Sequence, residues 1–206
     1  MTKNVQQWVR GTLLAGTVLI GVGGCGGSGD PLDNPPTVTE ASGGAGQSLS
    51  FAYFQQCVNP IFLAALPNPL NNGATTNTCS SAGCHDDATG RGAAFRIVPT
   101  ATPVPTSGGS ANFTQTEAQI ETTDMYKNFL STQGMVIVGN PAESLLINKP
   151  LTRGVLHGGG LIFANDQDPN IKQMEFWISN PLPAGEDEFG ASASSLFVNG
   201  TACQSE

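Results

Sequence analysis

The segment Cys79-Ser-Ser-Ala-Gly-Cys84-His85 constrains the fold of this chain more than any other feature. Its two cysteines are five positions apart, and a histidine follows the second one directly. In an α-helix, side chains five positions apart project about 140° from each other, so a regular helix would separate the two thiols. Ser80, Ser81 and Gly83 are small and allow the backbone to bulge. We therefore expect a non-helical turn here.

Two thiols followed at once by an imidazole are typical of covalent haem attachment, for which the usual spacing is C-x-x-C-H. The same chemistry is possible with four intervening residues: Cys79 and Cys84 would each bind one vinyl group, and His85 would be the proximal iron ligand. We expect one covalent haem c. Two alternatives remain: a plain disulfide between Cys79 and Cys84, and a zinc site completed by His157, although structural zinc sites usually have closer cysteine spacing.

The motif resembles the wider C-x-x-x-x-C-H variant of c-type cytochromes, and residues 50–182 are similar in their order of elements to a cytochrome c domain. The segment 140–150, followed by His157-Gly-Gly-Gly, is similar to the distal half of haem domains in bacterial lipoproteins and in planctomycete-type cytochromes. The resemblance implies a mainly α, cytochrome c-like helical domain with long loops. It also implies that the helices before the motif and at the end of the domain cross and pack.

Hydrophobic spacing and helix-start signals locate the elements of this expected domain. Phe51, Phe54 and Val58 are the first members of one helical stripe, which Pro60 would kink or end. The pattern predicts helices over 51–62, 116–130, 140–147 and 168–180, a strand over 93–98, and loops over 68–78 and 99–110.

The sixth iron ligand has several candidates. His157 is the only other histidine and lies in a glycine-rich loop, so it is the first distal candidate. Met135 is the runner-up, and Met125 and Met174 are further alternatives. Methionine would raise the reduction potential relative to two histidines. A site without a sixth protein ligand would permit small-ligand binding or peroxidase-like chemistry.

Cys57 and Cys203 remain once the other cysteines have roles. In an oxidising compartment, two leftover cysteines favour a disulfide. It would close a loop of 146 residues. The chain-entropy relation gives such a loop about 5 kcal/mol of stabilisation. Two free thiols are the alternative.

The first 48 residues indicate export and lipidation. Lys3 and Arg10 precede the uncharged segment 11–22, which has the length of a secretory signal and is too short to span a bilayer. Val22-Gly-Gly-Cys25 resembles a bacterial lipobox, with Cys25 as the lipidated residue. We expect a signal peptide over 1–24, a lipidated and flexible Gly/Ser/Pro tether over 25–48, and the haem domain with an acidic, Ser-rich tail over 49–206.

Charge limits the classes of partner. The net charge of −8 and pI of about 4.6 exclude a nucleic-acid binder, because phosphate contacts require Lys and Arg. Without the signal, six basic and sixteen acidic residues would remain. Membrane contact would then depend on the N-terminal lipid alone, and redox partners would dock through basic faces.

These expectations define a membrane-anchored monohaem electron carrier of the bacterial cell envelope, which is not a catalyst. The residue after Cys25 is Gly26, not Asp, which by resemblance to lipoprotein sorting rules favours the outer membrane, with the domain facing the periplasm. The alternative is a non-redox envelope lipoprotein, stapled by disulfides, that acts as a binding or structural module. A third possibility is a haem enzyme or sensor with an open distal site.

Overall fold

The computed structural model describes residues 46–205. The expected signal peptide, the lipidated Cys25 and most of the tether therefore lie outside the described residues. The last residues of the tether are described. They form backbone hydrogen bonds with residues 182–185, which follow the last α-helix of the chain. The carbonyl of Gly46 accepts a hydrogen bond from the amide of Gly185 (3.2 Å), and that of Ser48 accepts one from Leu182 (2.7 Å).

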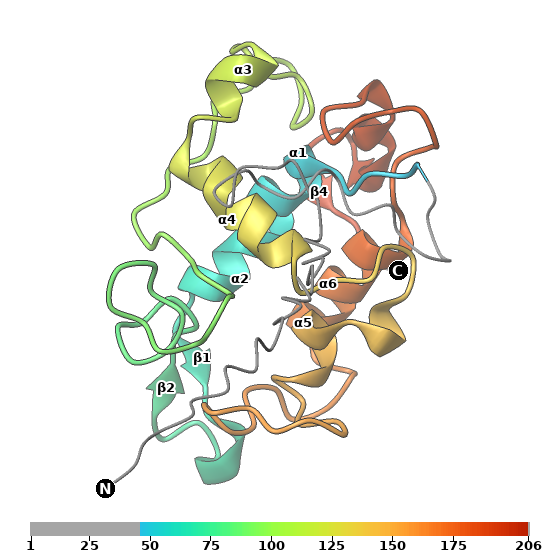
Figure 1. Cartoon of the computed structure of the whole chain (residues 1–206). Helices are drawn as coiled ribbons and strands as arrows, with labels where there is room; N and C mark the ends of the chain where they lie inside the picture. The colour runs from blue at the N-terminus through green and yellow to red at the C-terminus, as the bar shows by residue number, and fades with distance from the viewer. Residues whose placement is uncertain (1–45, 206) are drawn as a thin grey trace, which may run out of the picture. The chain divides into compact units, whose positions relative to one another are not determined.

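The prediction of a mainly α fold is wrong. Helices of all kinds make up 34% of the structure and strands 8%, as six short α-helices and two small sheets (Figure 1). The low helix content results from the long segments that connect the helices. The segment 99–110 contains three prolines and two adjacent glycines, and residues 149–168 form no helix. Proline removes an amide donor and glycine costs backbone entropy in a helix, so these segments form turns instead.

The elements are short throughout. The α-helices are α1 (Phe51–Tyr53), α2 (Asn59–Leu63), α3 (Glu117–Ile120), α4 (Asp124–Gln133), α5 (Leu145–Asn148) and α6 (Pro169–Ser179). Between them lie the π-helix η1 (Phe54–Val58) and the 3-10 turns η2 (Pro69–Asn71), η3 (Pro141–Glu143) and η4 (Ala191–Leu196). The strands form two antiparallel hairpins, β1 (Leu66–Pro67) with β2 (Thr76–Asn77) and β3 (Phe197–Val198) with β4 (Ala202–Cys203).

The first helical stretch runs through α1, η1 and α2 without ending at Pro60. Ser50 caps its start, since its side chain accepts a hydrogen bond from the amide of Tyr53 (3.1 Å). Pro60 has no amide hydrogen to donate to the preceding turn. The backbone widens to a π-helix just before it, with the amide of Asn59 bonded to the carbonyl of Phe54. The stretch therefore ends at Leu63 instead.

Four further expected elements differ. The helix predicted over 140–147 is divided into η3 and α5, and the loop predicted over 68–78 contains η2 and β2. The helix predicted over 116–130 is divided into α3 and α4, because Thr116 caps one helix and Thr123 caps the other. The strand predicted over 93–98 is absent from the described structure. Instead, Ile97 makes one isolated parallel bridge with Asp86.

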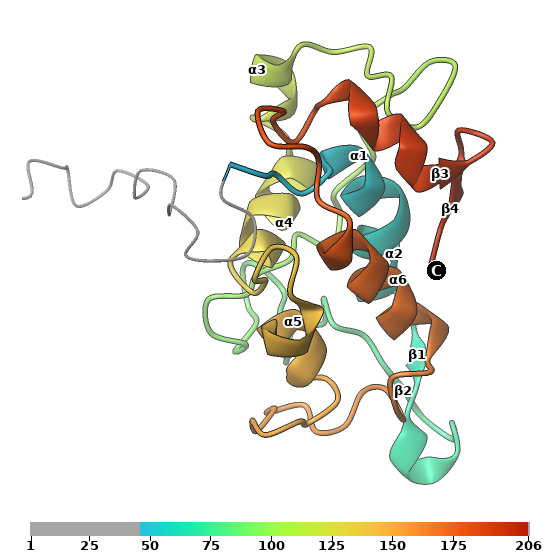
Figure 2. The ribbon, with the colours of Figure 1, turned by 90° about the vertical axis from the view of Figure 1, so that its right-hand side faces the viewer.

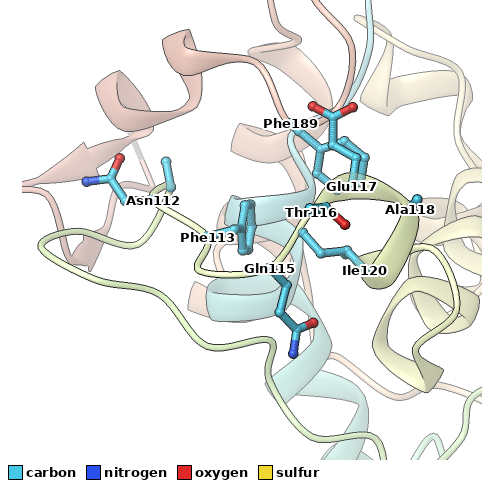
Figure 3. A pocket seen from close by; sticks show the side chains of 9 residues that line it. Asn112, Phe113, Gln115, Thr116, Glu117, Ala118, Ile120 and Phe189 are labelled. Atoms are coloured by element: carbon cyan, nitrogen blue, oxygen red, sulfur yellow. The ribbon is translucent and has the colours of Figure 1, made fainter.

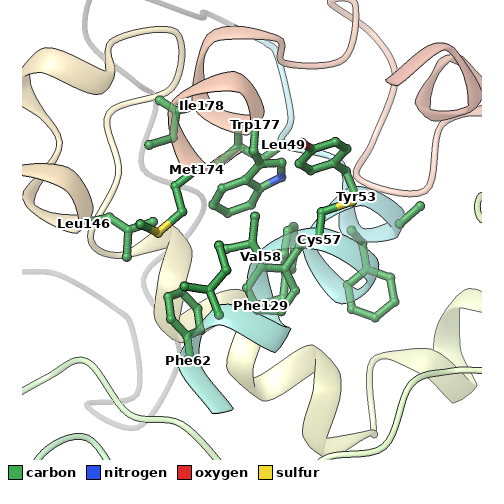
Figure 4. Packing of buried hydrophobic residues seen from close by; sticks show 14 of the residues in the cluster. Leu49, Tyr53, Cys57, Val58, Phe62, Phe129, Leu146, Met174, Trp177 and Ile178 are labelled. Carbon is green, nitrogen blue, oxygen red and sulfur yellow. The ribbon is translucent and has the colours of Figure 1, made fainter. Parts of the chain in front are cut away.

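The core lies between the first helical stretch and α6 (Figure 4). Trp177 of α6 is fully buried, its ring centroid lies 5.6 Å from that of Phe54, and its Nε1 donates to the carbonyl of Ser50 (3.0 Å). The expected packing of the first and last helices is confirmed. Met125 and Met174 are 1% exposed and belong to this core.

The predicted disulfide between Cys57 and Cys203 is confirmed, with the two Cα atoms 5.9 Å apart. It fixes β4 to η1. The hydroxyl of Tyr53 also donates to the carbonyl of Gln204, next to the disulfide. The acidic, Ser-rich tail is thus part of the folded unit.

The loop between α5 and α6 lies at the same end of the folded unit as the β1–β2 hairpin, and α3 lies at the opposite end (Figures 1 and 2). None of the helices that the structure describes is long and apolar enough to cross a bilayer.

Candidate functional site

The segment 79–85 forms a turn, as its cysteine spacing predicted. The amide of His85 donates to the carbonyl of Cys79 (2.9 Å), six positions back, which an α-helix does not allow. The amide of Ser80 donates to the carbonyl of Phe62 (3.1 Å), so the end of α2 anchors the start of the turn. Both cysteines and the histidine are partly buried.

His85 is held by the chain that returns beside it. The amide of Ile97 donates to the carbonyl of His85 (2.7 Å). Nδ1 of His85 lies 3.0 Å from the carbonyl oxygen of Phe95, and the two rings are 4.6 Å apart between centroids. These contacts fix both the backbone and the ring of His85.

Helix α4 holds this returning segment in place. The Ser131 hydroxyl oxygen accepts from the amide of Arg96 (2.6 Å). The side chain of Asn128 accepts from the amide of Val98 (2.7 Å) and donates to its carbonyl (3.1 Å). Asn128 is fully buried and also donates to Asn59 (3.0 Å). The position of the Phe95 carbonyl therefore depends on buried contacts with α4.

Gly92 provides the space that the His85 ring occupies. A Cβ atom at this position would lie 2.1 Å from Nδ1 of His85 and 2.9 Å from the carbonyl oxygen of Cys84. The Gly92 amide itself donates to that carbonyl (2.8 Å). Only glycine therefore fits here without moving the imidazole.

His157 lies in the loop 151–161. The loop is closed at its base, where the carbonyl of Pro150 accepts from the amide of Ile162 (2.8 Å). Nδ1 of His157 lies 2.8 Å from the carbonyl oxygen of Gly160. A Cβ atom at Gly159 would lie 3.2 Å from Cε1 of His157, which is a tight contact. Glycines thus flank both histidines.

The structure brings the two histidines together. The ring centroids of His85 and His157 lie 6.1 Å apart, and the ring planes are within 8° of parallel. Each Nδ1 is hydrogen-bonded to a backbone carbonyl, which places the proton on Nδ1 and leaves the Nε2 lone pair free. Iron-ligating histidines ordinarily have this second hydrogen bond. Two metal–imidazole bonds of about 2 Å together with the two ring radii give a similar separation, about 6 Å.

Burial lowers the pKa of His85 below its usual value. The hydrogen bond to Phe95 opposes this shift, whereas the nearby His157 and then the positive charges of Lys149 and Arg96 add to it. His85 is therefore neutral at pH 7, as a metal ligand must be. Within the described chain the salt bridges are Lys127–Asp124 and Arg153–Asp166, so Lys149 and Arg96 have no carboxylate partner there.

Cys79 and Cys84 are both free thiols in the structure. The structure therefore does not support the alternative of a disulfide between them. Burial and the neighbouring Cys84 raise the pKa of Cys79 to about 11. Cys79 is thus a protonated thiol at neutral pH. Both thiols remain available for another covalent bond.

The zinc alternative does not fit the geometry. No three His, Cys, Asp or Glu side chains among residues 46–205 gather closely enough to hold a metal ion. A structural zinc site needs four such ligands. A haem iron needs at most two from the protein, which matches a pair of histidines. Met135, the runner-up sixth ligand, is partly buried against the core just after α4.

The structure also contains a hollow of about 660 Å³, between the segment 111–120 and Phe189 (Figure 3). Its lining includes Phe113 and Ile120, and its single titratable side chain is Glu117. Neither histidine and neither free cysteine lines it. Among the described residues, the two histidines and the two free cysteines therefore lie outside this hollow.

Sequence reasoning missed the residues that orient the histidines. These are Gly92, and the backbone carbonyls of Phe95 and Gly160. A carbonyl has no sequence signal. Gly92 had one, since it lies in a Gly-Arg-Gly step seven residues after His85, but its purpose is visible only when the chain has folded back.

Comparison with known proteins assigns no family to this chain. No family model, no curated protein and no solved structure matches it. The chemistry of the site therefore rests on its own residues.

Proposed function

We propose that this protein is a monohaem c-type cytochrome that transfers single electrons. The observation that carries this proposal is the close pair His85 and His157, with nearly parallel rings, a centroid separation of 6.1 Å, and Nδ1 of each hydrogen-bonded to a carbonyl. When bound, the haem supplies an iron that alternates between Fe(III) and Fe(II). The fold around the pair differs from a mainly α domain, so the proposal concerns the attachment chemistry and the ligands.

The roles of the other residues follow from the chemistry of the group. Cys79 and Cys84 would each add across one vinyl group: the sulfur forms a carbon–sulfur bond, and the thiol hydrogen is taken up by the adjacent vinyl carbon. The unpaired positive charges of Lys149 and Arg96 would offset the two haem carboxylates. His85 is neutral without help from a metal, so its Nε2 lone pair is ready for iron.

Electron transfer is favoured over catalysis because two protein side chains, His85 and His157, would hold the iron. A bis-histidine site leaves no iron position for substrate in its closed form. Cys25 would hold the domain at the outer membrane through lipid, facing the periplasm, and the acidic chain would attract partners with basic docking faces. Such attraction predicts an association rate that falls as salt is added.

The test is a covalent-haem stain on a denaturing gel. The full chain, with its signal, is expressed in a host that matures c-type cytochromes. A stained band that survives denaturation is expected. An exported, lipidated and unstained protein would contradict the proposal and favour a non-redox envelope module.

Replacing the sixth ligand separates His157 from the other candidates. In His157→Ala the iron loses one axial nitrogen, so we expect the low-spin absorption spectrum to become high-spin while covalent haem is retained. Met135→Leu is the control and should leave the spectrum unchanged. An unaltered low-spin spectrum in His157→Ala would exclude His157 as the ligand.

Gly92→Ala tests the geometry around the proximal ligand. The added methyl group would overlap the His85 ring, so the imidazole must leave its position. We expect a mixed-spin spectrum and a lower yield of holoprotein. Gly83→Ala is a matched control within the motif, since a Cβ there meets no atom within 4 Å. Identical spectra for the two variants would show that Gly92 does not position His85.

A further inference from the structure

The two histidines are held very differently, although their ring centroids lie only 6.1 Å apart. His85 is fixed by contacts from outside its own turn: the amide of Ile97, the carbonyl of Phe95 and the close approach of Gly92. His157 makes its side-chain hydrogen bond to Gly160, three residues away in its own loop. His85 is therefore held by the segments packed around it, and His157 is held by its own loop.

Few bonds join the loop 151–161 to the rest of the structure. Among the described residues, 154–161 hydrogen-bond only with one another, through His157 and Gly160. The start of the loop is tied to α5 by the amide of Arg153, which donates to the carbonyl of Asn148 (2.9 Å). Segments with so few bonds open at low free energy.

The closed loop also carries features that favour opening. Thr152 has a φ of +52°, in the left-handed region that disfavours β-branched residues. Gly154 and Gly160, with φ of +62° and +72°, provide flexible points on either side of His157. Leu156 is 94% exposed, so closure buries little of this apolar side chain. Figure 2 shows the loop at the periphery, away from the packed helices.

One ion pair connects the loop to the chain just before α6. Arg153 and Asp166 are 2.9 Å apart and both are substantially exposed. The pair joins the start of the loop to the segment that follows its end. Breaking it would release the loop without touching either histidine.

We propose, on the basis of the haem assignment above, that the loop 151–161 is a hinged lid and that its opening replaces His157 with a small neutral exogenous ligand. His85 stays in place during this exchange. The ligand class is a small neutral donor molecule, because a neutral imidazole would be exchanged for a neutral donor, with no change in charge or oxidation state. Arg153 and Asp166 form the latch.

The experiment uses the matured full chain, reduced with dithionite, with carbon monoxide as the probe. The rate of binding, followed by absorbance, should reach a plateau at high carbon monoxide concentration, because loop opening becomes limiting. In Arg153→Gln the plateau rate should rise about two- to fivefold, the range expected when an exposed ion pair is lost. Lys127→Gln breaks the other exposed ion pair, with Asp124, which lies outside the loop, and should leave the rate unchanged.

Hydrogen exchange gives a second readout that does not require the iron. Amides of residues 154–161 should exchange faster than those of α4, and faster still in Arg153→Gln. Equal plateau rates in the two variants, or no carbon monoxide binding by a low-spin holoprotein, would overturn the lid. A chain without haem would contradict the proposed function instead, and slow exchange over 154–161 would then overturn the lid as well.

Discussion

The double variant Cys79→Ser/Cys84→Ser is expected to contain no covalent haem. A hydroxyl does not replace a thiol in the addition to a vinyl group, so both carbon–sulfur bonds are lost. Each single variant, with one remaining thiol, should retain a covalent band of lower intensity. The measurement is a haem stain on a denaturing gel, normalised to the amount of mature protein.

Cys57→Ser/Cys203→Ser provides the matched control for that experiment. It removes the same number of sulfur atoms from the chain but leaves the motif intact, so its covalent stain should persist in whatever protein folds. Loss of stain in both double variants to the same degree would mean that the effect reports folding, and the role assigned to Cys79 and Cys84 would be withdrawn.

Removing the Cys57–Cys203 disulfide should produce the largest loss of stability. The bond closes a loop of 146 residues. By the chain-entropy relation, opening a loop of that size lowers the free energy of unfolding by about 5 kcal/mol. Small loop-rich domains with modest cores depend strongly on such bonds. Guanidinium unfolding of the wild type and of Cys57→Ser/Cys203→Ser, under identical oxidising conditions, measures the difference.

The location of the change can be checked at the same time. Amides of the tail near Cys203, such as that of Gln204, which donates to the carbonyl of Leu196, should lose protection from hydrogen exchange first. Trp177→Phe is a useful comparison, because it removes a buried hydrogen bond to Ser50 and some core volume without opening the chain, at a cost of about 2 kcal/mol. A double cysteine variant no less stable than Trp177→Phe would contradict the expected effect of the disulfide.

The site was more predictable from the sequence than the fold. Counting the remaining cysteines predicted the partner of Cys57. His157 was expected to lie near His85 because it is the only other histidine. Both inferences depend on residue chemistry, which is local to a side chain. The non-helical turn at 79–85 likewise followed from spacing alone.

The fold class was not predictable in the same way. The split between α3 and α4 depends on whether Thr123 caps a helix or continues one, and threonine does both. The continuation of the first helical stretch through Pro60 depends on a π-turn that packing against α6 stabilises. Tertiary contacts determine where both helices end, and the hydrophobic periodicity of the sequence does not predict those contacts.

The most direct test of the central claim is the low-temperature electron paramagnetic resonance spectrum of the oxidised, matured protein. Two imidazoles with ring planes within 8° of parallel predict a rhombic low-spin signal, and His157→Ala should convert it to a high-spin one. A high-spin signal in the wild type, or no haem signal from a chain matured in a competent host, would contradict the account.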